Sequence, residues 1–390
     1  MKGVKGRGKG RRVHREEVGI AHEEPIEVAP DAGRDGFKAD GVLEVLGDKS
    51  FLWLPDGGQR RAIVRVEGGA QPHWETGMRA GGRLVRRQER WIVEDIETDK
   101  SGGPRFEELT SISPKSRLRL ETDGNSLATR VIDIVAPVGK GQRGLIVAPP
   151  RTGKTTLLRQ IGEGVLQNHP EVHLIILLVD ERPEEVTDLV RGVPGAELFA
   201  SSIDSEMEIH TRISVLAVER AKRLVEGGRD VLLLVDSLTR IGRAFNNRAG
   251  NGGRTMSGGV DSRALEAPRR LFAAARNTEE GGSLTIVATA LVGTESRMDE
   301  LIFQEFKGTG NMELVLDRAI AERRIWPAVD IFLSGTRKEE LIIGGDAVTK
   351  INAIRRSLSA DKPVDATERL LSLLSKHPSN EDVLAGILPA

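Results

Sequence analysis

Residues 144–155 read G-L-I-V-A-P-P-R-T-G-K-T, and they decide the fold of this 390-residue chain. An apolar run ends at Ala148, and a helix is expected to begin near Thr155. Between them, Gly153 lets the backbone turn so that its amides face phosphate oxygens, and the helix N-terminus adds partial positive charge. Lys154 should reach the β and γ phosphates of a nucleotide. The stretch therefore predicts ATP binding and hydrolysis, and an ordinary strand-to-helix turn is the alternative.

This phosphate-binding loop supplies most of the expected nucleotide contacts. Thr155 should hold Mg²⁺ through its hydroxyl. Ala148 stands where such loops usually have their first glycine, and the two prolines that follow stiffen the loop. The loop residues expected to bind the nucleotide are Pro150, Arg151, Thr152, Gly153, Lys154, Thr155 and Thr156.

Two acidic residues follow apolar runs further along the chain. Asp236 ends the run V-L-L-L-V-D, and an acidic residue that leaves a buried strand is the second magnesium element of such ATPases. Glu181 follows L-I-I-L-L-V-D, where a carboxylate can polarise the attacking water. Arg182 joins the expected nucleotide-binding set. The alternative for Glu181 is a capping role in the next helix, together with Glu184 and Glu185.

Two cationic clusters lie closer to the C-terminus. Arg323 and Arg324 precede Trp326, and the segment S-G-T-R-K at 334–338 contains Arg337. An arginine fork can stabilise the charge that develops on a transferred phosphoryl group, by roughly 10³–10⁵ in rate. Composition alone leaves surface charge as an equal alternative for both clusters.

From residue 128 to the C-terminus, apolar runs alternate with helical patterns. The expected buried strands are 144–148, 173–179, 230–235 and 283–291, and the clearest helix is 207–226. Strands buried on both faces that alternate with helices predict an α/β domain with a mostly parallel sheet over residues 128–390.

The N-terminal part has a different character. Residues 39–115 contain closely spaced β-like segments, which predict a small barrel, and residues 116–127 are expected to be a linker. The segments are 41–46, 50–54, 61–66, 83–87 and 90–96. Residues 1–38 begin with a Gly/Lys/Arg run and continue with an acidic stretch, which predicts a disordered arm. The arm is either an RNA-contacting segment or a solubilising tail.

Composition excludes several classes of function. The formal net charge is −1, so any nucleic-acid binding must come from local patches. The absence of cysteine excludes disulfides and thiolate metal sites, and it fits a cytoplasmic protein. No apolar run approaches the ~20 residues that span a membrane.

A long Gly-rich stretch interrupts the α/β pattern at residues 240–259. It contains N-N-R-A-G-N-G-G-R-T-M-S-G-G, with cations at Arg248 and Arg254. Long Gly-rich segments inside compact domains are usually functional loops, so this one is expected to contact phosphates. A disordered insertion is the alternative.

Several longer segments carry a more specific signal than the phosphate loop. They are G-Q-R-G-L-I-V-A-P-P at 141–150, L-V-D-E-R-P-E-E-V-T at 178–187, V-D-S-L-T-R at 235–240, S-G-G-V-D at 257–261, A-A-R-N-T-E-E-G-G-S-L-T-I-V-A-T-A-L at 274–291, E-F-K-G-T-G-N-M-E-L at 305–314 and S-G-T-R-K-E-E-L at 334–341. With these segments in this order, the chain resembles the bacterial transcription termination factor Rho family, which are ring-shaped RNA-dependent ATPases of the RecA-like class.

The resemblance implies a RecA-like ATPase domain preceded by an OB or cold-shock-like barrel. It implies a homohexamer that moves 5′ to 3′ along single-stranded nascent RNA as a helicase and terminates transcription. ATP and Mg²⁺ would be the cofactors, and RNA polymerase with its elongation factors would be further partners.

The resemblance also implies roles for matching residues. Glu181 would activate water, and Lys154 would bind the transferred phosphoryl group. Trp326 would stack on adenine. Arg337 would be an arginine finger that reaches into a neighbouring subunit's site, and Arg324 would assist it nearby.

RNA-binding residues follow from the same resemblance. Arg254, Arg297 and Lys307 match positions that line a central RNA channel. Phe51 and Trp53 lie in the barrel strand that stacks bases in the family. Here that strand reads D-K-S-F-L-W-L, without the Gly/Phe alternation of the family, and the chain has no tyrosine.

Two other classes of function compete with this one. The first is a RecA-like ring ATPase of the secretion or rotary type that does not act on RNA, since D-S-L-T-R occurs in both groups. The segment E-F-K-G-T-G-N-M-E-L favours the Rho-like class. The second is an RNA-binding regulator with a vestigial motor, and the intact set of Lys154, Glu181, Asp236 and Arg337 argues against it.

Overall fold

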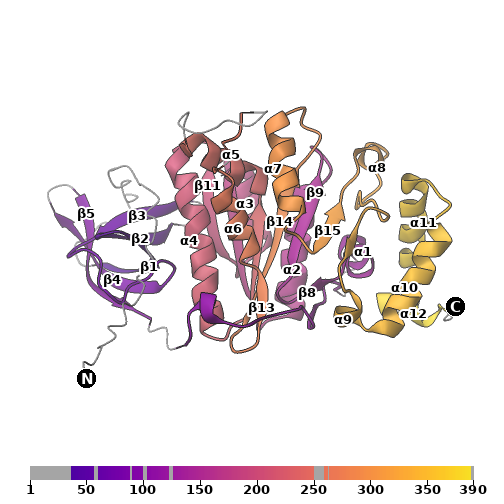
Figure 1. Cartoon of the computed structure of the whole chain (residues 1–390), viewed down its shortest axis with the longest axis horizontal. Helices are drawn as coiled ribbons and strands as arrows, with labels where there is room; N and C mark the ends of the chain where they lie inside the picture. Colours follow the sequence, from indigo (N-terminus) through magenta and orange to yellow (C-terminus); the bar gives the residue numbers. More distant parts are fainter. Residues whose placement is uncertain are drawn as a thin grey trace, which may run out of the picture.

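The computed structural model describes residues 37–56, 60–87, 90–99, 103–122, 126–249, 259–261 and 263–387. Figure 1 shows a small β-barrel at one end, a sheet covered by helices in the middle and a group of C-terminal helices at the other end. Almost all of the expected basic arm, residues 1–36, lies outside the described part of the chain.

The barrel contains the five strands that the sequence predicted, each longer than expected. They are β1 (Phe37–Leu46), β2 (Lys49–Asp56), β3 (Arg60–Val66), β4 (Arg79–Arg87) and β5 (Arg90–Thr98). They close in the order β1-β2-β3-β5-β4, which is consistent with an OB fold. Alternate residues point inward, and Leu43, Leu52 and Leu84 are among the fully buried side chains of its core.

The α/β domain is built on a mostly parallel sheet in the order β11-β10-β12-β14-β9-β15-β16. Its strands are β9 (Arg143–Ala148), β10 (His173–Glu181), β11 (Glu197–Ser202), β12 (Val231–Asp236), β14 (Ser283–Leu291), β15 (Met312–Val315) and the antiparallel β16 (Gly335–Thr336). The four predicted strands are confirmed. The sequence did not indicate β11, whose side chains are only partly apolar, or β15, which is only four residues long.

Helices cover both faces of this sheet. The central ones are α1 (Leu127–Val135), α2 (Lys154–Asn168), α3 (Pro183–Gly192), α4 (Met207–Glu226), α5 (Leu238–Ala249), α6 (Glu266–Ala273) and α7 (Arg297–Lys307). The predicted helix 207–226 is confirmed with the same bounds. Successive residues of β9 alternate between two cores: Leu145 packs with α4 to α7, and Ile146 packs with α1 to α3. This alternation explains why the strands are apolar throughout.

The remaining elements of the α/β domain lie outside the strand order given above, although two of the short strands are attached to the same sheet. They are α8 (Arg318–Glu322), α9 (Glu340–Ile343), α10 (Gly345–Leu358), α11 (Pro363–Ser375) and α12 (Asn380–Ala385), with the short strands β6 (Ser111–Ile112), β7 (Arg117–Leu118), β8 (Val138–Gly139) and β13 (Arg276–Thr278). β7 lies in the expected linker and pairs with β8, whereas β6 lies before the linker and pairs with β13. Phe106, in the short 3-10 helix η1 (Phe106–Glu108), is fully buried, and its amide donates to Glu226 Oε1 at 2.7 Å. The chain therefore joins the surface of the α/β domain well before residue 116.

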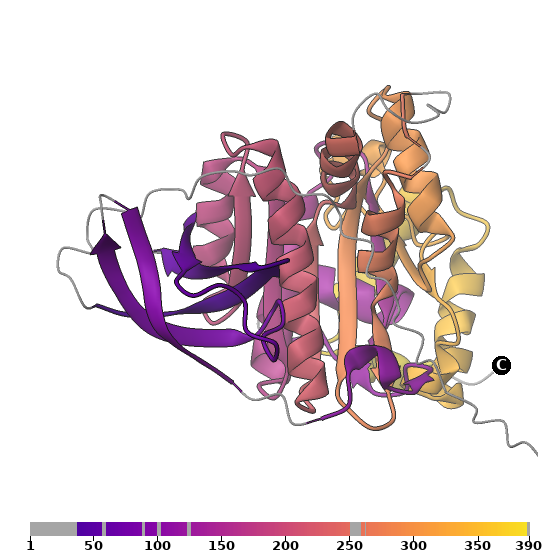
Figure 2. The ribbon, with the colours of Figure 1, turned by 60° about the vertical axis from the view of Figure 1, so that its left-hand side comes forward.

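The barrel is held against α4 by a buried ion pair and two aromatic rings. Arg212 donates from Nη2 to Glu44 Oε2 at 2.8 Å, and the same oxygen accepts a 2.6 Å bond from Trp53 Nε1. The guanidinium carbon of Arg212 lies 5.1 Å from the ring centre of Phe51 and 5.6 Å from that of Trp53. Figures 1 and 2 both show the barrel beside α4.

This junction corrects the prediction that Phe51 and Trp53 stack RNA bases. Trp53 is 1% exposed and Phe51 9% exposed, and both belong to the core that continues into the α/β domain. Arg212 lies over both rings, and little of either ring's surface is left open to a base. The physical reason is that an aromatic ring suits a buried cation as well as a base, so residue type alone did not distinguish the two.

We expect Arg212→Ala to destabilise the chain by about 3–5 kcal/mol, because it leaves the buried carboxylate of Glu44 without its cation. Urea unfolding followed by circular dichroism measures the effect. Arg79→Ala is the matched control, because Arg79 pairs with Asp40 on the exposed barrel surface, where such pairs contribute about 0–1 kcal/mol. Equal losses in the two variants would show that the junction does not stabilise the fold.

Candidate nucleotide site

The predicted phosphate-binding loop connects β9 to α2. Gly153 is the residue before α2 and has a φ of 82°, a left-handed conformation that glycine adopts without strain. Thr152 is buried and donates from Oγ1 to the carbonyl of Pro149 at 2.7 Å, which fixes the turn. A side chain at position 153 would also crowd the ring of Trp326, 3.0 Å from its Cβ. The loop leaves Pro150, Arg151 and Thr156 exposed beside the N-terminus of α2.

Lys154 points from the first turn of α2 to the end of β12. Its Nζ pairs with Asp236 Oδ1, and Thr289 Oγ1 donates to the same oxygen at 2.8 Å. Asp236 is 1% exposed, and its Oδ2 has no hydrogen-bond partner among the described residues. A buried carboxylate oxygen without a partner is costly unless a ligand completes it.

Glu181 ends β10, on the strand next to β12. It is 2% exposed and accepts a 3.2 Å bond on Oε1 from Arg240 Nη2, whereas Oε2 is buried without a partner among the described residues. Burial and the nearby charge of Asp236 raise the pKa of the Glu181 carboxyl to about 7. A carboxylate with that pKa suits general base catalysis near neutral pH. Sequence reasoning did not find Arg240 as its partner.

The hydroxyl of Thr155 faces α3. Its Oγ1 donates to Glu185 Oε2 at 3.2 Å, and the other oxygen of Glu185 accepts from Arg182 Nη1 at 3.3 Å. Sequence reasoning considered Glu185 only as a helix-capping residue. The structure places it in the site, beside the residue expected to hold Mg²⁺.

A cavity of about 320 Å³ opens next to the phosphate loop. Its lining is Ser126, Leu127, Ala128, Thr152, Gly153, Thr156, Leu157, Gln160, Leu316, Trp326, Pro327 and Ala328. Trp326 keeps 44% of its surface exposed, and Arg324 lies exposed two residues earlier. An apolar hollow with an aromatic ring beside a phosphate loop has the character of a nucleotide base site.

Arg337 does not join these residues within its own chain. It follows β16, in which Thr336 pairs with Met312, and Met312 in turn pairs with Gly144 at the start of β9. The phosphate loop follows the other end of β9. Arg337 therefore lies exposed towards the end of the sheet that is opposite the phosphate loop.

Two of the three cations expected to bind RNA lie at opposite ends of α7. Arg297 begins α7 and Lys307 ends it, so they are about 15 Å apart along the helix axis. Both are exposed, and Lys307 Nζ lies 5.7 Å from the ring centre of Phe303. Arg254 lies outside the described residues.

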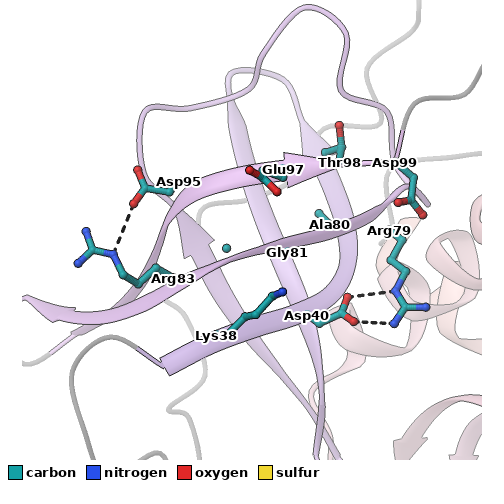
Figure 3. Close-up of a pocket in the computed structure, with 11 residues that line it drawn as sticks. Lys38, Asp40, Arg79, Ala80, Gly81, Arg83, Asp95, Glu97, Thr98 and Asp99 are labelled. Carbon is teal, nitrogen blue, oxygen red and sulfur yellow. Dashed lines mark hydrogen bonds and ion pairs between the residues drawn. The ribbon is translucent and has the colours of Figure 1, made fainter.

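The barrel has a separate open groove of about 550 Å³, shown in Figure 3. Its lining mixes Lys38, Asp40, Arg79, Ala80, Gly81, Gly82, Arg83, Asp95, Glu97, Thr98 and Asp99. Arg79 donates from Nε to Asp40 Oδ1 at 3.1 Å, and Arg83 pairs with Asp95. Because this lining contains no aromatic ring and its arginines are paired, the groove lacks the platform on which bases stack.

The described residues contain no group of three or more histidine, aspartate or glutamate side chains that could hold a metal ion by itself. A divalent cation at Thr155 and Asp236 would therefore need phosphate oxygens as further ligands. The hydroxyl of Thr155 and the unpartnered Oδ2 of Asp236 fit that arrangement. No helix in the described ranges is long and apolar enough to cross a membrane.

The comparison with known proteins agrees with this geometry. Residues 128–336 match the model of the ATP synthase alpha/beta family nucleotide-binding domain. Transcription termination factor Rho from Streptomyces lividans is 57% identical over 286 residues, which are 73% of this chain and 40% of that protein. Rho from Cereibacter sphaeroides is 47% identical over 91% of this chain and 89% of its own length. Rho from Aquifex aeolicus is 47% identical over 94% of this chain and 89% of its own length.

Among solved structures, an ATPase from the type III secretion system of pathogenic bacteria superposes with a TM-score of 0.59. It is 21% identical and covers 74% of this chain and 89% of its own, so the likeness concerns the fold alone. The predicted α/β ATPase fold is confirmed. The expected resemblance is confirmed too, and a secretion-type ATPase is the less similar alternative.

The raised pKa of Glu181 predicts a pH-dependent stability. The folded chain keeps the proton of Glu181 up to about pH 7, whereas the unfolded chain releases it near the ordinary value of 4.5. Stability should therefore fall as pH rises between these values, and stay lowered above pH 7. We expect Glu181→Gln to raise Tm above pH 7, by about 1 °C for each kcal/mol gained in a chain of 390 residues.

Thermal scans of the nucleotide-free protein from pH 5 to pH 8 measure this effect, with exposed Glu184→Gln as the control. The gain from Glu181→Gln should shrink towards pH 5. A gain that is the same at every pH, or a loss, would contradict the raised pKa of the buried Glu181 carboxyl.

Proposed function

The chain belongs to the transcription termination factor Rho family, and we propose that it is an RNA-dependent ATPase that moves 5′ to 3′ along nascent RNA and terminates transcription. One observation carries the catalytic part of the proposal. Two buried carboxylates, Glu181 and Asp236, converge beside Lys154 at the end of the phosphate loop, and each has one oxygen without a partner among the described residues.

The residues of the loop bind the phosphates of ATP. The backbone amides of residues 151–154 face the phosphate oxygens, and Lys154 exchanges its pair with Asp236 for the β and γ phosphates. Bound Mg²⁺ would neutralise phosphate charge, with Thr155 and Asp236 as the residues that hold it. Trp326 stacks on the adenine in the adjoining cavity.

Glu181 acts as the general base. Arg240 fixes one carboxylate oxygen at 3.2 Å, so the other oxygen is left to orient the attacking water and accept its proton. The pKa of about 7 places this proton transfer near neutral pH. Arg182, which donates to Glu185, lies beside the phosphates.

The site is completed by a second copy of the chain. Because Arg337 lies at the far end of its own sheet, we propose that it enters the nucleotide site of a neighbour in a homohexameric ring, with Arg324 assisting. A head-to-tail contact of this kind generates a closed ring. Arg254, Arg297 and Lys307 would face RNA in the ring, whose partners in the cytoplasm include RNA polymerase and its elongation factors.

We expect Glu181→Gln to lower RNA-stimulated ATP hydrolysis by about 10²–10⁴, because the general base is lost, while ATP still binds. Hydrolysis is measured with poly(C), with poly(U) and without RNA, and Glu184→Gln is the control of equal charge change. A wild-type rate in Glu181→Gln would refute the role of Glu181. Hydrolysis by the wild type that no RNA stimulates would favour the secretion-type alternative.

We expect Arg337→Ala to abolish hydrolysis alone and to recover part of it when mixed with Glu181→Gln subunits. In such mixed rings, some sites combine the intact Glu181 of one subunit with the intact Arg337 of its neighbour. Lys338→Ala, which removes the adjacent exposed cation, is the control. Full activity of Arg337→Ala alone, or of a monomer, would refute the shared site.

A further inference from the structure

Glu185 lies on the first turn of α3, where its carboxylate spans two residues of the nucleotide site. Oε2 accepts from the hydroxyl of Thr155 at 3.2 Å, and Oε1 accepts from the guanidinium of Arg182 at 3.3 Å. The Glu185 side chain is 28% exposed, so it is neither a buried core residue nor a freely solvated one.

The contact with Thr155 determines the direction of a hydroxyl. A threonine hydroxyl has one hydrogen and two lone pairs, and it rotates towards the best acceptor. When the Thr155 hydroxyl donates its hydrogen bond to Glu185, the lone pairs of Thr155 Oγ1 point away from α3 and are available to a cation. A carboxylate acceptor also makes the oxygen a stronger ligand, as second partners of metal ligands do generally.

A second, independent observation indicates a cation at this place. Asp236 Oδ2 and Glu181 Oε2 are both buried and have no hydrogen-bond partner among the described residues. Lys154 is already paired with the other oxygen of Asp236, and Arg240 with the other oxygen of Glu181. The site thus keeps two buried carboxyl oxygens that no described protein group satisfies.

We propose that Glu185 is a positioning residue for the metal: it orients the hydroxyl of Thr155 so that Thr155 can hold Mg²⁺ together with the bound nucleotide. This inference rests on the function proposed above. Glu181 and Glu185 belong to the same strand-to-helix junction, so the end of β10 and the start of α3 set both the general base and the orientation of the metal ligand.

The test measures binding without turnover. A non-hydrolysable ATP analogue is titrated by calorimetry at a series of Mg²⁺ concentrations, with the full chain of the wild type, Glu185→Ala and Glu185→Gln. We expect the half-saturating Mg²⁺ concentration to rise roughly 10–100-fold in Glu185→Ala. Glu185→Gln should stay close to the wild type, because its amide oxygen still accepts the hydrogen of Thr155. Without Mg²⁺, all three proteins should bind the analogue alike.

Two controls separate this role from others. Glu184→Ala removes the same charge from the same turn of α3 and should leave the Mg²⁺ dependence unchanged. In a Thr155→Val background, which has no hydroxyl to orient, Glu185→Ala should cause little further loss of Mg²⁺ affinity. If Glu185→Ala fails to fold, Glu185→Leu fills the same space without an acceptor and takes its place.

The outcomes are distinct. A Mg²⁺ dependence of Glu185→Ala equal to that of the wild type would overturn the inference, as would a full further loss in the Thr155→Val background. If Glu185→Gln weakened Mg²⁺ binding as much as Glu185→Ala, the charge of Glu185 and not the orientation of the Thr155 hydroxyl would determine Mg²⁺ affinity. That result would also overturn the inference. If the wild type itself binds no nucleotide with Mg²⁺, the proposed function fails, and this inference fails with it.

Discussion

The buried ion pair between Lys154 and Asp236 is the contact on which the rest of the structure depends. The two residues belong to elements that are not adjacent, because β14 lies between β9 and β12 in the sheet. The pair forms only if the loop after β9 folds back over β14, where Thr289 supplies a third partner. A buried carboxylate without its cation is strongly destabilising. The pair therefore constrains the path of the loop, the order of the strands and the small residues at the end of β14 that the loop crosses. In the function proposed above, phosphate takes the place of the carboxylate at Lys154.

Sequence patterns predicted the elements of this fold better than their contacts. Periodicity placed α4 at its observed bounds and found the five barrel strands, because local patterns record which face of an element is buried. The short β15 and the half-exposed β11 carried too little of that pattern. Of the site, Lys154, Thr155, Glu181 and Asp236 were predicted and come together. Glu185 and Arg240 were not, since their partners lie 30 and 59 residues away in the chain and only the tertiary structure aligns them.

The barrel shows a different limit of sequence reasoning. The alternation of Phe51 and Trp53 predicts one shared face but not what that face contacts. Glu44 pairs with Arg212, which is 168 residues away in the chain, and the guanidinium lies over the aromatic rings on which a base would stack. The same aromatic pair therefore joins the barrel to the motor domain. Binding of RNA by the barrel, if it occurs, must use another surface.

The tryptophans of the chain are divided between its two parts in a useful way. The chain has four tryptophans and no tyrosine. Trp74 and Trp91 pack against the barrel core, and Trp53 lies at the junction of the barrel with α4, whereas Trp326 lines the cavity beside the phosphate loop. With Trp326 replaced by phenylalanine, intrinsic ultraviolet emission reports on the barrel and its junction with α4. The difference in emission between this variant and the unmodified chain comes from Trp326 beside the cavity. The protein therefore carries its own optical probe of nucleotide occupancy, without an attached dye.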